Sequence, residues 1–306
     1  MIYPPKLKAR DKVIIVGPAG VVEKKDLDQA IELLKLWELD VATGDNLYKQ
    51  HYFFAATDLE RLSDLQKALD DPLISAIFCA RGGYGTGKIL DHLNFEKFLK
   101  KPKWIIGFSD ITLLHLKLHA LGVASIHGVV ARQLSGSVDQ ASIHSLKEML
   151  FSDSDIEYKW ATNVLNKSGS VSGQIIGGNL TLLCNNIGSN SDIHYKNKIL
   201  FIEEVGERLY AIDRYLNQLD RAGRLKSLAG MILGQFTDIK ETKPPYGKNA
   251  YQIVEEYVKY YDFPVAYGFP SGHAKRNQAI PLSFNCDLSV SQSGSEIRFY
   301  KDQQAL

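Results

Sequence analysis

A serine stands where an apolar run changes into a helical pattern. The run Trp104-Ile105-Ile106 leads into Gly107-Phe108-Ser109-Asp110, and apolar residues at helical spacing follow from 111 to 121. A strand that turns directly into a helix exposes the side chain at the corner and directs the first helical N–H groups toward it. Ser109 is therefore a candidate nucleophile. The alternative is that Ser109 only caps the helix, because serine is a preferred N-cap residue.

A glycine-rich loop follows another short apolar run, residues 75–79. It reads Ala80-Arg81-Gly82-Gly83-Tyr84-Gly85. Glycines let the main chain approach a ligand and leave N–H groups available for an oxyanion, although a flexible turn would use the same residues. Arg81 could bind a substrate carboxylate or pair with a neighbouring acid. Ile89 stands where a nucleotide-binding P-loop needs Ser or Thr, which disfavours nucleotide hydrolysis.

Two further segments supply a carboxylate and an imidazole. The apolar run 199–202 ends in Glu203 and Glu204, whose side chains lie on opposite faces of a strand and so cannot form a close carboxylate pair. One of them could orient a histidine, and for Glu204 the preferred interpretation is a strand end at the surface. His273 follows Gly272 after the apolar run 265–267. A histidine there can act as a general base, although a structural histidine is the commoner outcome.

The sequence offers little support for a metal site. His115 and His119 have the four-residue spacing of a zinc pair on a helix, but Leu116 stands where a zinc protease has Glu, and the surrounding helix is apolar. Packing or capping is therefore the favoured interpretation of these histidines. The three cysteines of the chain are too few and too scattered for a disulfide framework or a metal knuckle.

Strands and helices alternate through the first 150 residues. Apolar runs at 12–16, 75–79 and 104–108 are separated by helical patterns, of which the one from residue 57 opens with a capping box. This alternation predicts a parallel α/β sheet, in which ligands lie beyond the carboxyl ends of the strands. Ser109 and the glycine loop both fall there.

The second half mixes strand and helix patterns without an internal repeat. Strands are expected at 198–202, 228–236, 288–291 and 296–300, with helices near 210–219 and 250–261. Between the halves, Ser, Asp, Lys and Asn dominate and apolar periodicity is lost, which is typical of a linker. We therefore expect an α/β domain at 1–135, a linker or mobile loop at 136–172 and a mixed domain at 173–306.

The composition is that of a globular protein. The 306 residues are 45% hydrophobic and carry a formal net charge of +1, which gives no general attraction to nucleic acid or to anionic membranes. The apolar run 13–16 is too short for a signal peptide, and no segment approaches the roughly 20 apolar residues of a spanning helix. We expect a cytoplasmic protein that binds neither nucleic acid nor membrane.

Taken together, the motifs resemble the LD-carboxypeptidase family of serine peptidases, which also contains the microcin C immunity enzymes. The resemblance covers most of the chain, and the pairing of an arginine-glycine loop with a Gly-aromatic-Ser-Asp turn is specific. In chain order the matching segments are Val16-Gly17-Pro18-Ala19-Gly20, Ala56-Thr57-Asp58 with Arg61, Asp64 and Leu65, Ala80-Arg81-Gly82-Gly83-Tyr84-Gly85, Gly107-Phe108-Ser109-Asp110, Gly177-Gly178-Asn179-Leu180, Phe201-Ile202-Glu203-Glu204 and Gly272-His273. Two departures are Glu204, where the family usually has Asp, and Thr86-Gly87-Lys88, where many members carry a serine and later an arginine.

The resemblance implies a role for each residue of the trio. Ser109 would be the nucleophile, Glu203 the orienting acid and His273 the general base. The main-chain N–H groups of Gly83 and Asp110 would form the oxyanion hole. The roles are set by geometry, so the chain order Ser, Glu, His is no obstacle to a triad mechanism.

The resemblance also implies the surroundings of that trio. Arg81, Gly82 and Asn179 would contact substrate. The family fold is an N-terminal Rossmann-like α/β domain with a C-terminal mixed, β-rich α/β domain, usually in a homodimer with the site between the domains.

A member of this family would release the terminal D-alanine of a murein tetrapeptide during peptidoglycan recycling, by hydrolysis of an L,D amide bond. It would require no metal and no organic cofactor. The first alternative is an immunity-type hydrolase that cleaves an acyl-amide bond in a peptidyl-nucleotide, with Trp160 as a platform for the base. The second is a non-catalytic sensor that binds murein peptides, which has no need of Ser109, Glu203 and His273 together.

Overall fold

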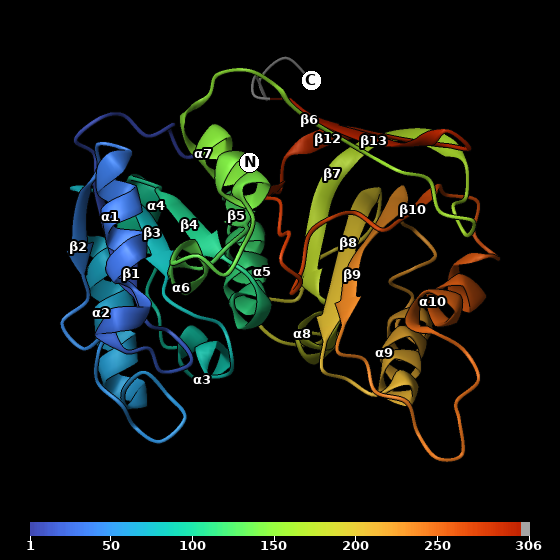
Figure 1. The fold of residues 1–306 in the computed structure, drawn as a ribbon, viewed down its shortest axis with the longest axis horizontal. Coiled ribbons are helices and arrows are strands. Elements are labelled where there is room, and N and C mark those ends of the chain that lie inside the picture. The colour runs from blue at the N-terminus through green and yellow to red at the C-terminus, as the bar shows by residue number, and fades with distance from the viewer. Residues whose placement is uncertain (301–306) are drawn as a thin grey trace. The chain divides into compact units, whose positions relative to one another are not determined.

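The computed structural model describes residues 1–300, which form two compact units (Figure 1). Unit 1 comprises Met1–Ser152 and Asn277–Ile280, and unit 2 comprises Asp153–Arg276 with the chain from Pro281 onward. In the described residues no helix is both long and apolar enough to cross a membrane.

Unit 1 is built on a six-stranded sheet in the order β11-β5-β4-β3-β1-β2. The pairs β2-β1, β1-β3, β3-β4 and β4-β5 are parallel, which confirms the predicted Rossmann-like sheet. Its strands are β1 (Lys12–Val16), β2 (Asp40–Thr43), β3 (Ile74–Cys79), β4 (Trp104–Gly107), β5 (Ser125–His127) and β11 (Ile280–Leu282). The helices are η1 (Lys24–Asp26), α1 (Asp28–Leu36), α2 (Asp58–Asp70), α3 (Thr86–Leu90), α4 (Glu96–Lys100), η2 (Ser109–Ile111), α5 (Thr112–Ala120), α6 (Ala131–Leu134) and α7 (Gln140–Phe151).

Unit 2 contains a seven-stranded mixed sheet in the order β10-β9-β8-β7-β12-β13-β6. The four strands from β10 to β7 are parallel and the ladder from β7 to β6 is antiparallel, which confirms the predicted mixed α/β domain. The strands are β6 (Ile156–Trp160), β7 (Gly169–Asn179), β8 (Lys198–Val205), β9 (Gly230–Thr237), β10 (Val265–Tyr267), β12 (Asn285–Ser291) and β13 (Gly294–Phe299). The helices are α8 (Leu180–Asn185), α9 (Leu209–Arg221) and α10 (Ala250–Val258).

The segment 136–172, expected to be a linker or mobile loop, instead contains regular structure. It includes α7, β6 and the start of β7, and the boundary between the two units lies at 152–153. The polar residues that suggested a linker belong to exposed faces: in β6, Glu157 and Lys159 are exposed while Ile156 and Tyr158 are buried. Asp139 caps α7 by accepting a hydrogen bond from the N–H of Ser142 at 3.0 Å. A half-buried strand and a capped helix thus account for the composition.

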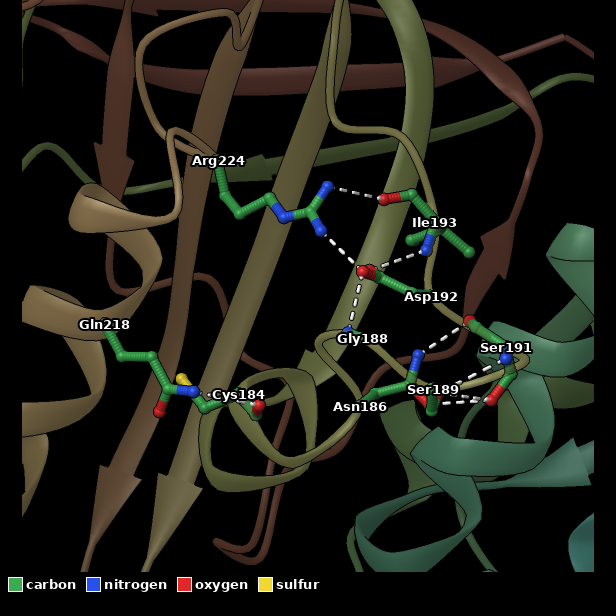
Figure 2. Close-up of polar contacts among 9 residues, drawn as sticks. All are labelled: Cys184, Asn186, Gly188, Ser189, Ser191, Asp192, Ile193, Gln218 and Arg224. Atoms are coloured by element: carbon green, nitrogen blue, oxygen red, sulfur yellow. Dashed lines mark hydrogen bonds and ion pairs between the residues drawn. The ribbon is translucent and has the colours of Figure 1, made fainter.

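The loop after α8 is held by a compact polar network (Figure 2). The side-chain oxygen of Asn186 accepts hydrogen bonds from Ser189 Oγ and Ser191 Oγ at 2.8 and 2.7 Å. Asp192 forms an ion pair with Arg224 at 2.5 Å, and both side chains are about four-fifths buried, with exposed fractions of 21% and 22%. Arg224 follows α9, so this pair joins the loop after α8 to the loop after α9.

The substitution Arg224→Ala should lower the free energy of unfolding by about 2 kcal/mol, because it removes a charged hydrogen bond and leaves Asp192 partly buried without its counter-ion. Urea denaturation followed by circular dichroism would measure the change. Arg221→Ala, at an exposed position in the last turn of α9, is the matched control and should change stability by less than about 0.5 kcal/mol. Equal losses in the two variants would contradict a role for the Asp192 pair.

Candidate active site

Ser109 lies at a sharp turn between β4 and the helices that follow. Its φ of +63° places it in the left-handed region, which is uncommon for a residue with a side chain and typical of a nucleophile elbow. The N-cap positions of η2 and α5 are Phe108 and Ile111, and neither makes a side-chain cap bond. The Ser109 hydroxyl makes no hydrogen bond within unit 1. These observations do not fit the alternative in which Ser109 is a helix cap.

The glycine loop lies directly against this turn. Strands β3 and β4 are parallel neighbours, so the loops at their carboxyl ends meet. A Cβ atom on Gly82 would lie 2.8 Å from the Cβ of Ser109, so only glycine permits this approach. Gly83, with φ of +107°, donates no main-chain hydrogen bond within the described residues, which leaves its N–H available for an oxyanion.

Asp110 is buried beside the nucleophile turn. Its main-chain N–H lies in the first turn of η2, where such groups have no partner inside the helix. Its carboxylate accepts a hydrogen bond from the N–H of Thr86, the first residue of α3, at 2.7 Å. Burial raises the pKa of Asp110, while contacts with Thr86 and the positive charge of Arg61 oppose that shift. The family resemblance implied a role only for the main chain of Asp110.

Arg81 extends toward the turn that follows β1. Its Nη1 donates to the carbonyl of Val21 at 2.9 Å, and the Gly82 carbonyl accepts from Gly20 N–H at 3.0 Å. Burial and the nearby positive charge of Arg132 lower the pKa of Arg81. One guanidinium nitrogen is therefore occupied by the protein, and a contact between Arg81 and substrate remains a prediction.

Glu203 and His273 are brought together in unit 2. His273 Nδ1 lies 2.7 Å from Glu203 Oε2, and the Glu203 side chain is fully buried near the carboxyl end of β8, an interior strand of the sheet. Because a carboxylate accepts, Nδ1 carries the proton and the lone pair lies on Nε2, which is the tautomer a general base needs. The His273 side chain keeps an exposed fraction of 17%.

The neighbouring strand β9 positions the histidine loop. Gln235 N–H donates to the Ser271 carbonyl at 2.9 Å, and Gln235 Oε1 accepts from Ala274 N–H at 3.2 Å. Gly272 has φ of +138°, and a Cβ there would lie 3.2 Å from Glu203 Oε2. Main-chain contacts on both sides of His273 therefore hold the imidazole against the carboxylate.

Glu204, expected at the surface, is buried, so that interpretation is wrong. Its Oε1 accepts from Asn179 Nδ2 and from Val205 N–H at 2.8 Å, and its Oε2 accepts from Thr181 N–H and Oγ at 2.8 Å. Burial and the charge of Glu203 raise the pKa of Glu204. Asn179 also caps α8 through its side-chain oxygen. Glu204 thus ties the end of β8 to the start of α8, and both ends of the Asn179 amide are engaged.

His115 contacts the main chain just before the nucleophile turn. Its Nε2 lies 2.8 Å from the Gly107 carbonyl and its Nδ1 2.8 Å from Ser125 Oγ. Because a carbonyl only accepts, Nε2 carries the proton and Nδ1 accepts from the serine hydroxyl. Complete burial lowers the pKa of His115 to about 4. The preference for packing over metal binding agrees with these contacts.

Trp160, the platform required by the peptidyl-nucleotide alternative, is part of β6. Its indole N–H donates to the Tyr267 carbonyl at 3.0 Å, and its ring packs edge-on against Phe269 at 5.0 Å between centroids. The side chain therefore helps to join β6 to the segment around β10.

The predicted residues thus fall into two groups. Ser109, Gly82, Gly83 and Asp110 come together in unit 1, and Glu203 and His273 come together in unit 2. Sequence reasoning missed the buried guanidinium of Arg61, which accompanies the capping box of α2. The available signal was that helical spacing places Arg61 on the face that also carries the buried Leu65, Ala68 and Leu69.

Comparisons with known proteins identify both halves of the chain. Residues 13–128 match the LD-carboxypeptidase N-terminal domain, and residues 172–288 match the LD-carboxypeptidase C-terminal domain. The chain is 33% identical to a probable murein peptide carboxypeptidase of Bacillus subtilis, over 99% of this chain and 97% of the relative.

Solved structures share the fold. The structure of muramoyltetrapeptide carboxypeptidase from Oxalobacter formigenes is 28% identical with a TM-score of 0.87, covering 94% of this chain and 98% of that one. The microcin C7 self immunity protein in complex with aspartyl sulfamoyl adenosine is 20% identical with a TM-score of 0.88, covering 98% of each chain. At that identity the second likeness concerns the fold alone.

The free energy of unfolding should depend on His115 at acid pH. Between pH 6.5 and about 4 the unfolded chain binds a proton at this residue that the folded chain does not bind, so stability falls as the pH is lowered, by about 3 kcal/mol in total. Urea titrations at a series of pH values would compare wild type with His115→Gln. Because carboxyl groups titrate in the same range, the difference between the two slopes isolates the imidazole. Identical slopes would contradict this prediction.

Proposed function

The chain belongs to the LD-carboxypeptidase family, and from this premise we propose that it is a serine carboxypeptidase that releases the terminal D-alanine of a murein tetrapeptide. The proposed reaction is hydrolysis of an L,D amide bond. The observation that carries the proposal is the 2.7 Å contact between His273 Nδ1 and the buried Glu203. In a serine hydrolase the acid holds the histidine base through the same contact. Ser109, partly exposed at the turn after β4, would supply the nucleophile.

In the proposed mechanism Ser109 Oγ attacks the amide carbonyl while His273 Nε2 takes its proton. Glu203 holds the imidazole in the required tautomer and stabilises the imidazolium that forms. The N–H groups of Gly83 and Asp110 stabilise the oxyanion of the tetrahedral intermediate. His273 then protonates the amine of the departing D-alanine, and water, activated in the same way, hydrolyses the acyl-enzyme.

A carboxypeptidase also has to recognise the terminal carboxylate of its substrate. We propose that Arg81, with Gly82 and Asn179, contributes to this recognition, because a guanidinium can bind a carboxylate through its remaining donors. The partly buried position of Arg81 favours such an interaction over a fully solvated one. The proposed chemistry relies on side chains and main-chain donors alone.

The proposal extends to the setting of the enzyme. We expect a cytoplasmic homodimer that acts on small peptides during peptidoglycan recycling, as the family resemblance implies. The peptidyl-nucleotide alternative is less well supported, because it needs an aromatic platform for the base and Trp160 packs against Phe269 within unit 2.

Release of D-alanine tests the proposed reaction. Purified protein incubated with a murein tetrapeptide ending in D-alanine should yield the tripeptide and free D-alanine, measured by mass spectrometry. Ser109→Ala and His273→Ala should each lower turnover by about 10³-fold or more, since members of such a unit act together. Ser137→Ala, an exposed serine in unit 1, is the control and should retain activity. Turnover by Ser109→Ala at the wild-type rate would remove Ser109 from the mechanism.

The expected homodimer has a simple test. Size-exclusion chromatography with light scattering should give twice the mass of the chain at micromolar concentration, because a closed two-fold dimer is the commonest assembly of soluble chains. A mass equal to one chain across the accessible concentration range would contradict the expectation.

A further inference from the structure

The two proposed oxyanion donors belong to different elements. Gly83 lies in the loop after β3, whereas Asp110 lies in the turn after β4. The loop that carries Gly83 contains two residues with positive φ, Gly83 and Gly85, and Tyr84 between them is more than half exposed. A glycine-rich loop of this kind has a large conformational freedom to lose, so contacts from outside it must fix the position of its N–H group.

The first of these contacts comes from the Asp110 side chain. Its Oδ2 accepts the N–H of Thr86 at 2.7 Å, and the carboxylate is 2% exposed. Thr86 follows Gly85 directly and begins α3. A buried carboxylate on a main-chain N–H is a charge-assisted hydrogen bond, which is shorter and stronger than a neutral one. The residue that offers one oxyanion donor therefore also holds the end of the loop that offers the other.

The second contact comes from Arg61, whose side chain is buried under the same loop. Its Nη1 donates to the Gly85 carbonyl at 2.9 Å and to the Pro18 carbonyl, and its Nη2 pairs with Asp58 at 2.5 Å. A Cβ on Gly85 would lie 2.7 Å from Nη1, so the guanidinium fills the space beneath the loop. The guanidinium also lies 5.0 Å from the centre of the Phe54 ring. Arg61 thus ties the loop to the turn after β1 and to the start of α2.

We infer that Arg61 and the Asp110 carboxylate act together as positioning residues, a loop clamp that fixes the Gly83 N–H relative to Ser109 and to the Asp110 N–H. The inference rests on the proposed function, because it assigns a purpose to the clamp only if an oxyanion forms there. Neither side chain needs to touch the substrate. Both act through the main chain of residues 83–86.

The physical reason for such a clamp is the steep dependence of oxyanion stabilisation on geometry. The donors must lie within hydrogen-bond distance of where the oxyanion will be, before the reaction begins, and loss of one donor typically lowers the rate by about 10²–10³-fold. A displacement of about 1 Å can have a comparable effect. A ground-state carbonyl depends much less on these donors, so a loosened loop should lower kcat and leave KM nearly unchanged.

Substitutions at Asp110 test the clamp without removing the main-chain donor. Asp110→Ala deletes the contact with Thr86 and should lower kcat for D-alanine release by about 10²-fold, with KM changed by less than about threefold. Asp110→Asn keeps an oxygen acceptor and should restore kcat to within about tenfold of wild type. Thermal unfolding of each variant shows whether the chain is still folded.

Arg61→Lys is the second variant, because Asp110→Ala could fail to fold. Lysine keeps the charge but cannot reach the two carbonyls and Asp58 together, so kcat should again fall by about 10-fold or more at nearly constant KM. Asp139→Ala is the matched control. It removes a carboxylate that caps α7 in the same unit, outside the glycine loop and the turn after β4, and should lower the unfolding temperature without lowering kcat.

A second readout separates this inference from the proposed substrate. A fluorophosphonate forms a bond to the serine oxygen with loss of fluoride, and its phosphoryl oxygen occupies the oxyanion hole. Labelling of Ser109 should slow by about 10-fold or more in Asp110→Ala and recover in Asp110→Asn. If wild type is labelled but releases no D-alanine, the substrate assignment fails and the labelling rates still test the clamp.

Wild-type kcat and labelling in both Asp110→Ala and Arg61→Lys would overturn the inference. So would a parallel loss of kcat in Asp139→Ala, because a general loss of stability would then explain every variant. A wild-type protein that neither releases D-alanine nor reacts with the fluorophosphonate would overturn the proposed function and the clamp with it.

Discussion

The placement of chemical groups in this protein depends on one constraint, that parallel strands end at the same edge of their sheet. Ser109 and the glycine loop follow the neighbouring strands β4 and β3, and Glu203 lies near the carboxyl end of β8, between β7 and β9. A side chain at the end of such a strand is fixed by the ladder behind it, yet it faces a loop region that can admit a ligand. In each unit the hydrogen-bonded strands therefore fix the positions of the polar groups at their carboxyl ends.

Both units bury charged side chains, and in unit 2 two buried carboxylates are neighbours on one strand. Glu203 and Glu204 are adjacent on β8 and buried on opposite faces, and the two carboxylates have different surroundings. Glu204 accepts four hydrogen bonds and ties α8 to the sheet. Glu203 has the His273 imidazole on one oxygen, and its other oxygen has no hydrogen-bond partner within the described residues. The contact with Glu203 thus fixes the orientation and the tautomer of the imidazole, which a histidine acting as a general base requires.

The sequence predicted what depends on local pattern. Apolar runs located β3, β4 and β8, the capping box located α2, and the residue types at the strand ends indicated Ser109, Glu203 and His273. It misjudged elements whose polar residues lie on an exposed face, as in β6 and α7, because a half-buried strand or helix of high polarity has the composition of a loop. A half-buried polar element differs from a loop in which of its residues face the core. Composition does not give that information.

The side-chain contacts that the sequence did not predict share a further property, which is that the two partners are distant in the chain. Asp110 contacts Thr86, Arg61 contacts Pro18 and Gly85, and Glu204 contacts Asn179, and the partners in each pair are at least 24 residues apart in the chain. No local pattern contains such a pairing, since the fold alone brings the partners together. Burial of a polar side chain without a hydrogen-bond partner costs free energy. Each of these side chains is therefore buried together with the group to which it is hydrogen-bonded. In the glycine loop, where Gly83 and Gly85 have positive φ, these partners are the Gly85 carbonyl and the Thr86 N–H, which Arg61 and Asp110 hold from outside the loop.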